Sequence, residues 1–323
     1  MPLIDRSSYR SPLGMANGHV QTIFPTLFRT RPEVNYKRTR ITTPDGDFLD
    51  LDWLRETDST QLVILTHGLE SSSSSKYISG MARAFHRLGW HALAWNLRGC
   101  SGEPNNKLTS YHSGSTDDLE TVIRHVEHLQ LYTSVVLIGF SLGGNITLKY
   151  LGDRGAKTPA VIKAVVSFSV ATDLESSAKR LERFENRIYM QRFLKTLEQK
   201  VRDKMKQFPG RLDDHGLKKM RTFREFDGAY TAPLNGFASA QDYWKRCSCG
   251  SVLGDITVPT LLVNAANDPF LPAECYPSRL AKDHPFLTLE IPDSGGHMGF
   301  VQLKSQPDYW TERRTIQFIR DHA

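Results

Sequence analysis

Apolar residues recur along the chain in short, β-branched runs that alternate with segments of helical period. The runs predict strands over residues 62–66, 92–96, 135–138, 162–168, 260–264 and 287–291. A further pair of strands over residues 35–54 is predicted as a hairpin that turns at Pro44, Asp45 and Gly46. Strands that alternate with helices are typical of an α/β protein with a mostly parallel sheet flanked by helices.

The alternation stops between residues 173 and 259, where the chain is charged and of helical period. Apolar residues recur there at helical spacing: Leu181, Phe184, Ile188, Phe193, Leu197, Val201, Met205 and Phe208. We expect these side chains to pack in the core, with some of them lining a tunnel. The domain organisation predicted is residues 1–172 as the first part of the sheet domain, 173–258 as a helical lid insertion, and 259–323 as the second part.

A serine stands at the end of one apolar run. Gly139, Ser141 and Gly143 form Gly-x-Ser-x-Gly between a predicted strand and a predicted helix, which is the context of a nucleophile elbow. This turn strains the serine backbone and brings the residues two before and two after it close together, which favours glycine at both. An isolated match to the pattern is an ordinary turn, and here the flanking strand and helix favour the elbow.

Two later segments carry candidate partners for this serine. The strand over 260–264 leads to Asp268, and the strand over 287–291 leads through a loop of small residues to His297. A neutral histidine can accept the Ser141 proton, and an aspartate can fix the tautomer of that histidine. Asp293 is the alternative acid. It lies only four positions before His297 on the same loop, whereas an acid on a neighbouring strand can approach the imidazole from its far side, so Asp268 is favoured.

The backbone donors for a developing oxyanion can also be assigned. They come from the loop after an early strand and from the residue after the nucleophile, which here gives the N–H groups of Leu69 and Leu142. We expect His67 to hydrogen-bond loop backbone. The serines at 71–75 are expected to pack beneath the site and to cap a helix that begins near Lys76.

With these residues the chain resembles the α/β-hydrolase superfamily, whose members carry the triad in the order Ser, Asp, His. Within it the chain is similar to the YheT-like esterases, which are related to abhydrolase-domain lipases and to yeast ethyl-ester synthase/esterases. The resemblance rests on residues 18–22, 67–75, 96–102, 111–119 and 139–145. It implies an α/β-hydrolase fold and hydrolysis of carboxylic esters or acylglycerols by Ser141, Asp268 and His297, with no cofactor and no metal. Relatives usually have a glycine at the position of Ser71.

The function has one alternative within the same chemistry. An acyl-enzyme can be attacked by an alcohol instead of water, which would make the protein an acyltransferase. His112 and Asp117 match a His-x4-Asp element that has been interpreted in relatives as an acyltransferase motif. The same stretch fits an N-cap at Ser115 followed by acids in a first helical turn. A binding module without catalysis would not require Ser141, Asp268 and His297 together.

Composition agrees with a globular esterase. The chain has 323 residues, of which 39% are hydrophobic, and no apolar run approaches the roughly 20 residues that span a bilayer. Its first residues lack the layout of a signal peptide, so we expect a cytoplasmic location.

Positive charge is concentrated in the predicted lid. Residues 179–225 hold 15 Lys and Arg against 7 Asp and Glu, a larger excess than the +6 of the whole chain. The default interpretation is a solvated helical face, and the alternative is a lid that rests on an anionic membrane. No motif or aromatic platform suggests a nucleic-acid partner. The expected partner is therefore a small-molecule ester substrate.

Overall fold

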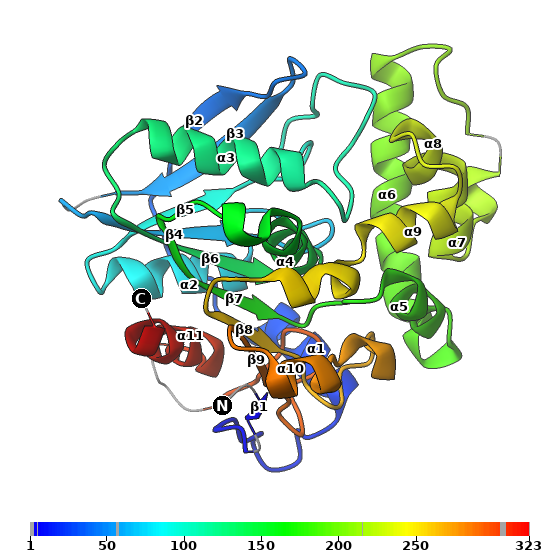
Figure 1. Ribbon diagram of the computed structural model, residues 1–323. Coiled ribbons are helices and arrows are strands. Elements are labelled where there is room, and N and C mark those ends of the chain that lie inside the picture. The colour runs from blue at the N-terminus through cyan, green and yellow to red at the C-terminus, as the bar shows by residue number, and fades with distance from the viewer. Residues whose placement is uncertain (1–2, 5, 56–57, 215, 304–307, 323) are drawn as a thin grey trace.

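The computed structural model describes residues 3–4, 6–55, 58–214, 216–303 and 308–322. In this part of the chain nine strands form one sheet in the order β1-β9-β8-β7-β6-β4-β5-β3-β2 (Figure 1). The strands are β1 (Leu3–Ile4), β2 (Lys37–Thr42), β3 (Phe48–Leu54), β4 (Gln61–Thr66), β5 (His91–Trp95), β6 (Ser134–Phe140), β7 (Ile162–Phe168), β8 (Thr260–Val263) and β9 (Leu287–Glu290). Pairing is antiparallel between β2 and β3 and between β3 and β5, and parallel elsewhere. The predicted fold class is confirmed.

The central strands are mainly apolar because both faces of the sheet are covered. In β4, Leu62 and Ile64 belong to one hydrophobic cluster, and Val63 and Leu65 belong to another. Successive side chains of a strand point to opposite faces. A parallel sheet buried on both sides therefore needs continuous apolar runs, which is the pattern that the sequence has.

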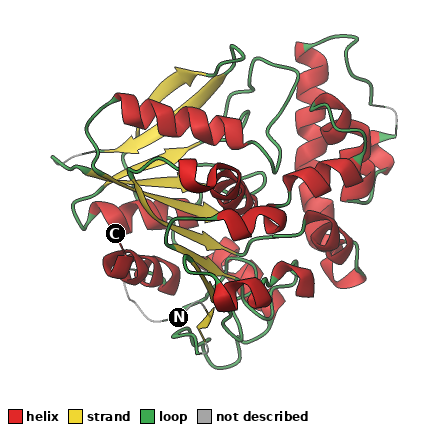
Figure 2. Ribbon diagram, viewed as in Figure 1, coloured by secondary structure: helices red, strands yellow, loops and turns green. Residues whose placement is uncertain are grey.

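Helices form a layer on each face of the sheet, as Figure 2 shows. Buried side chains of α2 and α11 pack in one hydrophobic cluster, and those of α3, α4 and α10 pack in the other. The helices outside the insertion are α1 (Gly18–Phe28), α2 (Lys76–His86), α3 (Thr116–His128), α4 (Leu142–Arg154), α10 (Ser278–Asp283) and α11 (Trp310–His322), with the short helices η1 (Gly155–Lys157) and η6 (Ala273–Cys275). Among the described residues, no helix is both long enough and apolar enough to cross a membrane.

The predicted strands lie within two residues of the observed ones. The hairpin is also as predicted, with Lys37 of β2 opposite Trp53 of β3. The sequence analysis missed β1, which has only two residues and pairs with β9 at the edge of the sheet. A strand of this length has no periodicity that could reveal it.

The segment between β7 and β8 forms a group of helices beside the sheet (Figure 1). They are α5 (Leu174–Leu181), η2 (Phe184–Asn186), α6 (Arg187–Gln207), η3 (Leu217–Lys219), α7 (Phe223–Phe226), η4 (Asp227–Thr231), α8 (Ala232–Leu234), α9 (Ala240–Cys247) and η5 (Cys249–Asp255). We call residues 173–258 the helical insertion. Its status as a separate unit stays a prediction.

The prediction that the apolar stripe of the insertion is buried is wrong at two positions. The side chains of Phe184 and Ile188 are 85% and 73% exposed, respectively, whereas Met190 and Leu194 are buried. The chain breaks its helix between α5 and α6, and the buried Asn186 amide there donates to the carbonyl oxygens of Arg180 and Pro269. A single helical period cannot continue across this break.

Candidate active site

Ser141 lies in a strained turn between β6 and α4. Its φ of 53° and ψ of −119° place a non-glycine residue in a sparsely populated region of backbone conformation. A Cβ on Gly139 would lie 2.6 Å from the Cα of Gly144, so the turn itself requires this glycine. A Cβ on Gly143 would lie 2.4 Å from the carbonyl oxygens of Thr66 and His67. A Cβ on Gly139 would also lie 2.7 Å from the Gly143 carbonyl oxygen, so the residues two before and two after Ser141 lie close together as expected. The approach of α4 to the end of β4 is a second reason for Gly143.

Three predicted residues form a continuous chain of hydrogen bonds. The Nε2 atom of His297 lies 2.8 Å from Ser141 Oγ, and its Nδ1 atom lies 2.9 Å from Asp268 Oδ2. The Asp268 carboxylate can only accept, so Nδ1 carries the proton and Nε2 is free to accept from the serine hydroxyl. Asp268 and His297 are both buried. This arrangement can move a proton from Ser141 to His297 and stabilise the resulting imidazolium.

The alternative acid does not reach the histidine. Asp293 is exposed on the loop after β9, whereas Asp268 follows β8 and is held by an additional bond from the Phe270 N–H to its Oδ1. The ring of Phe270 packs on the imidazole of His297, with 4.2 Å between the ring centroids. The preference for Asp268 over Asp293 as the partner of His297 agrees with this geometry.

The two backbone groups assigned as oxyanion donors lie at the same pocket as the serine. Leu69 and Leu142 line this pocket together with Ser141 and His297. Leu142 is the first residue of α4, where an N–H has no partner within its own helix. Gly68 brings the other loop close, because a Cβ there would lie 3.2 Å from the Ser141 Cβ. Both loops thus border the space where a carbonyl oxygen of a substrate would lie.

His67 holds the loops behind the oxyanion site. Its Nε2 atom accepts from the Leu97 N–H at 3.1 Å, and its Nδ1 atom donates to the Gly68 carbonyl at 2.8 Å. Burial lowers the pKa of His67 to about 4, so the ring is neutral at physiological pH. The expectation that His67 binds loop backbone is confirmed.

The serine run has a different hydrogen-bond pattern from the one expected. The helix α2 begins at Lys76 as predicted, but the Ser75 hydroxyl accepts from the Ser72 N–H and not from a helix N–H. The Ser73 hydroxyl donates to Asp52, and Tyr77 joins Ser71 to the Gly68 N–H. Because these short side chains hydrogen-bond one another and the neighbouring loops, they do not cap the helix.

The first helix of the chain supports the histidine loop, a role that the sequence analysis did not find. The Thr22 hydroxyl accepts from the His297 N–H at 2.9 Å, and the Asn267 side chain accepts from the Gly296 N–H. A Cβ on Gly18 would lie 2.0 Å from the Asn267 carbonyl oxygen, so α1 approaches this loop as closely as a glycine allows. The motif at residues 18–22 is one of the segments on which the resemblance rests, and it was the one available signal for this supporting role.

Other motif residues hold the loops around the pocket. Asn145 in α4 donates to the carbonyl oxygens of Ser113 and Cys247, and it accepts from the Cys249 N–H. This side chain fixes the end of the insertion to the helix that follows Ser141. In the segment 96–102, Arg98 forms an ion pair with Asp118 in the first turn of α3.

The His-x4-Asp element does not form a pair. His112 lines the pocket, and its Nδ1 atom accepts from the Gly114 N–H, whereas Asp117 is exposed in the first turn of α3. Burial lowers the pKa of His112 to about 4. Ser115 occupies the N-cap position, but its hydroxyl accepts from the His112 N–H and not from the helix. The helix interpretation of this stretch fits the structure.

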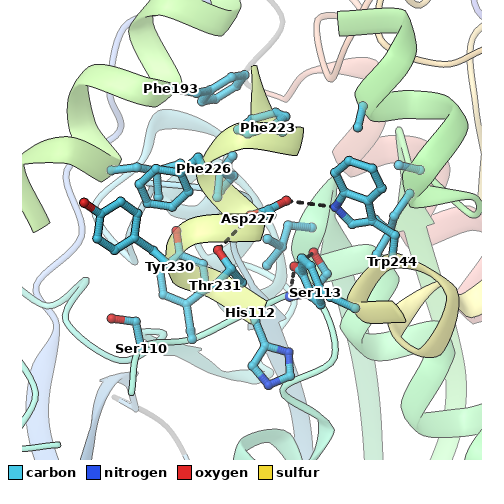
Figure 3. Close-up of a pocket in the computed structure, with 18 of the residues that line it drawn as sticks. Ser110, His112, Ser113, Phe193, Phe223, Phe226, Asp227, Tyr230, Thr231 and Trp244 are labelled. Carbon is cyan, nitrogen blue, oxygen red and sulfur yellow. Dashed lines mark hydrogen bonds between the residues drawn. The ribbon is translucent and has the colours of Figure 1, made fainter. Parts of the chain in front are cut away.

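The insertion forms the far wall of the pocket. Figure 3 shows aromatic side chains of this wall, and the apolar residues that line it include Leu181, Phe193, Leu197, Phe223, Phe226 and Leu234. Two lysines of α6 fasten the insertion to the sheet domain. Lys200 Nζ lies 2.9 Å from Glu70 Oε1, and Lys204 Nζ donates to the Asn105 carbonyl at 2.7 Å. Part of the positive charge in the insertion is therefore used inside the protein.

A strained serine on a turn after a parallel strand, a histidine and a buried aspartate define the class of α/β hydrolases. The family described as alpha/beta hydrolase fold matches residues 61–302, and the chain belongs to it. Within that family the chain belongs with the YheT-like proteins. It is 34% identical over 312 residues to YheT of Escherichia coli (strain K12), covering 95% of this chain and 91% of that protein.

Two further comparisons agree with this assignment. The chain is 32% identical over 315 residues to the human phospholipase ABHD3, covering 94% of this chain and 76% of that protein. Among solved structures, an esterase of Pyrococcus furiosus superposes with a TM-score of 0.58 at 16% identity, over 97% of this chain and 99% of that one, which shows the common fold. The chain is an enzyme of the esterase and lipase type of α/β hydrolase.

Proposed function

We propose that the enzyme hydrolyses carboxylic esters through an acyl-enzyme on Ser141. The observation that carries this proposal is the hydrogen-bond chain from Asp268 through His297 to Ser141. His297 acts as the general base, and Asp268 holds it in the tautomer that leaves Nε2 free. The backbone N–H groups of Leu69 and Leu142 receive the oxyanion.

The reaction needs only groups of this chain and water. Ser141 Oγ bonds to the carbonyl carbon of the ester while its proton passes to Nε2 of His297. The tetrahedral intermediate then breaks the bond to the leaving alcohol, which takes the proton from His297, and the acyl group stays on Ser141. Water gives its proton to His297 and attacks the acyl-enzyme. The acid leaves, and the proton returns to Ser141.

The lining of the pocket favours an acyl chain as the part of the substrate that lies against the insertion. Its wall there is formed by side chains such as Leu181, Phe193 and Phe226, which favour a hydrocarbon over a charged group. The substrate class that fits is short- or medium-chain acyl esters or acylglycerols. An alcohol could replace water in the second step, so acyl transfer is the alternative outcome.

A chain-length series of p-nitrophenyl esters and acylglycerols tests this function. We expect turnover of both kinds of ester with an optimum at short or medium acyl chains. Products are then measured with and without added alcohol. Free acid as the main product supports hydrolysis, and alkyl ester as the main product would assign acyl transfer. No turnover of any ester by folded protein would overturn the proposal.

We also propose that the insertion contacts anionic membranes and that the enzyme is cytoplasmic. Phe184 and Ile188 are exposed apolar side chains, and they lie beside the exposed Arg183 and Arg187. Apolar side chains that enter the lipid surface and cations that face the headgroups would act together.

A further inference from the structure

One acidic side chain lies in the pocket wall that the insertion forms, among mainly apolar residues. Asp227 lines the pocket with only 9% of its surface exposed, and of the described residues it is the only carboxylate in the pocket wall. It belongs to η4, a single turn of π-helix. Such turns are rare and occur frequently at functional sites.

Asp227 is held by two neutral donors. The Thr231 hydroxyl donates to Oδ1 at 2.7 Å, and the Trp244 indole N–H donates to Oδ2 at 2.8 Å (Figure 3). Within the described residues no cation forms an ion pair with this carboxylate. A carboxylate can accept about four hydrogen bonds, so each oxygen keeps capacity for one more.

An acid is a costly residue at this position. Burial raises the pKa of Asp227 to about 6, because water is removed from the carboxylate and no positive charge replaces it. The two donors alone do not require a charged acceptor, since a neutral amide oxygen also accepts hydrogen bonds. The carboxylate thus keeps acceptor capacity that the two donors from the protein do not use.

Several other polar groups of the pocket have partners within the protein. Lys200 is paired with Glu70, and the Lys204 ammonium donates to backbone carbonyls. The amide of Asn145 makes three hydrogen bonds to the backbone. Asp227 stands apart as an acid with open acceptor positions on the wall that faces an acyl chain.

We propose that Asp227 is a specificity subsite for a hydroxyl group carried on the acyl chain of the substrate. The hydroxyl donates to an open lone pair of the carboxylate, while the apolar side chains around it hold the hydrocarbon. A hydroxyl fits better than an ammonium, because Lys204 already brings to the same pocket a positive charge that donates to neutral oxygens. The inference rests on the proposed ester hydrolysis by Ser141.

The test compares p-nitrophenyl esters of equal length with and without a terminal hydroxyl, over chains of several lengths. For the wild type we expect the hydroxylated ester to have a kcat/KM at least about tenfold higher at one range of lengths, as suits a hydrogen bond to a charged group. In Asp227→Leu the ratio of the two kcat/KM values falls to about one, and this ratio is taken within one variant, so a general change in activity does not alter it. Ser110→Ala is the control, since it removes a hydroxyl of the pocket wall that is not one of the two donors to Asp227, so the preference stays.

Several outcomes would overturn the subsite. They are equal rates for both esters at every length, a hydroxyl preference that survives in Asp227→Leu, or a higher rate for the ω-amino ester than for the ω-hydroxy ester. Asp227→Asn is the second variant if Asp227→Leu does not fold, and it must reduce the preference, because a neutral amide oxygen is a weaker acceptor than a carboxylate. Wild-type protein that hydrolyses no plain ester at all would instead refute the proposed function.

Discussion

The sheet domain and the helical insertion contribute to the same pocket in different ways. The triad stands on loops that follow β6, β8 and β9, and its hydrogen bonds are 2.8 and 2.9 Å long. The insertion contributes pocket walls and the acid Asp227. The strands position the proposed catalytic residues, whereas the inserted helices shape the space that a substrate would enter. Substitutions in the two regions should therefore have effects of different kinds.

The largest expected effect is that of Ser141→Ala in the sheet domain. We expect kcat for p-nitrophenyl esters to fall by at least about 10⁴-fold with the fold intact, because the covalent route is lost. Ser110→Ala is the control, since Ser110 is another serine of the pocket wall. The circular dichroism spectrum and the melting temperature check the fold. Activity of Ser141→Ala near the wild-type level would place the nucleophile elsewhere.

A smaller loss is expected when the acid of the triad becomes an amide. Asp268→Asn should lower kcat by about 10³- to 10⁴-fold, because the amide can donate to Nδ1 and so favours the wrong tautomer of His297. Asp293→Asn should stay within about twofold of the wild type, since Asp293 is exposed and does not contact the histidine. The opposite result for this pair would assign the role to Asp293.

In the insertion, substitution of the buried acid should change stability in a pH-dependent way. Burial raises the pKa of Asp227 in the folded state to about 6, above its ordinary value of 3.8. The buried carboxylate charge therefore does not lower the free energy of unfolding below about pH 4. The loss grows as the pH rises to about 6 and stays constant at higher pH. The free energy of unfolding of Asp227→Asn minus that of the wild type should therefore rise by up to about 3 kcal/mol between pH 4 and pH 8.

Chemical denaturation of both proteins at the two pH values measures this difference. Hydrogen bonds lost with the amide affect both pH values alike, so the change between them isolates the charge. If the difference in unfolding free energy between the two proteins does not vary with pH, burial does not destabilise the charged form of Asp227.

The smallest effect concerns the membrane. The protein should co-sediment with phosphatidylglycerol vesicles at low salt, dissociate at high salt, and not bind phosphatidylcholine vesicles. Replacing Phe184 and Ile188 by Ser should weaken binding about tenfold, because two apolar side chains no longer enter the lipid. Leu131→Ser is the control, since this side chain is 51% exposed and precedes β6, away from the insertion. Equal binding to both vesicle types, or to neither, contradicts membrane contact by the insertion.

The sequence was most informative where local pattern determines structure. Strands were predicted within two residues, and Ser141, Asp268 and His297 each follow a strand that buries both faces. The bond between Thr22 and His297 joins residues 275 positions apart, and no local pattern could reveal it. The helix break at Asn186 likewise depends on Pro269, which lies 83 positions away. Contacts of this kind also position Asp227, whose neighbours Phe226 and Gly228 give no sign of a pocket.

Covalent labelling with a fluorophosphonate tests the central claim most directly. The reagent reacts with a serine activated by a neighbouring base, and peptide mapping by mass spectrometry locates the adduct. We expect one adduct per chain, on Ser141, no labelling of Ser141→Ala, and strongly reduced labelling of His297→Ala. An adduct on another residue, or an unlabelled wild-type protein that still hydrolyses esters, would contradict the account.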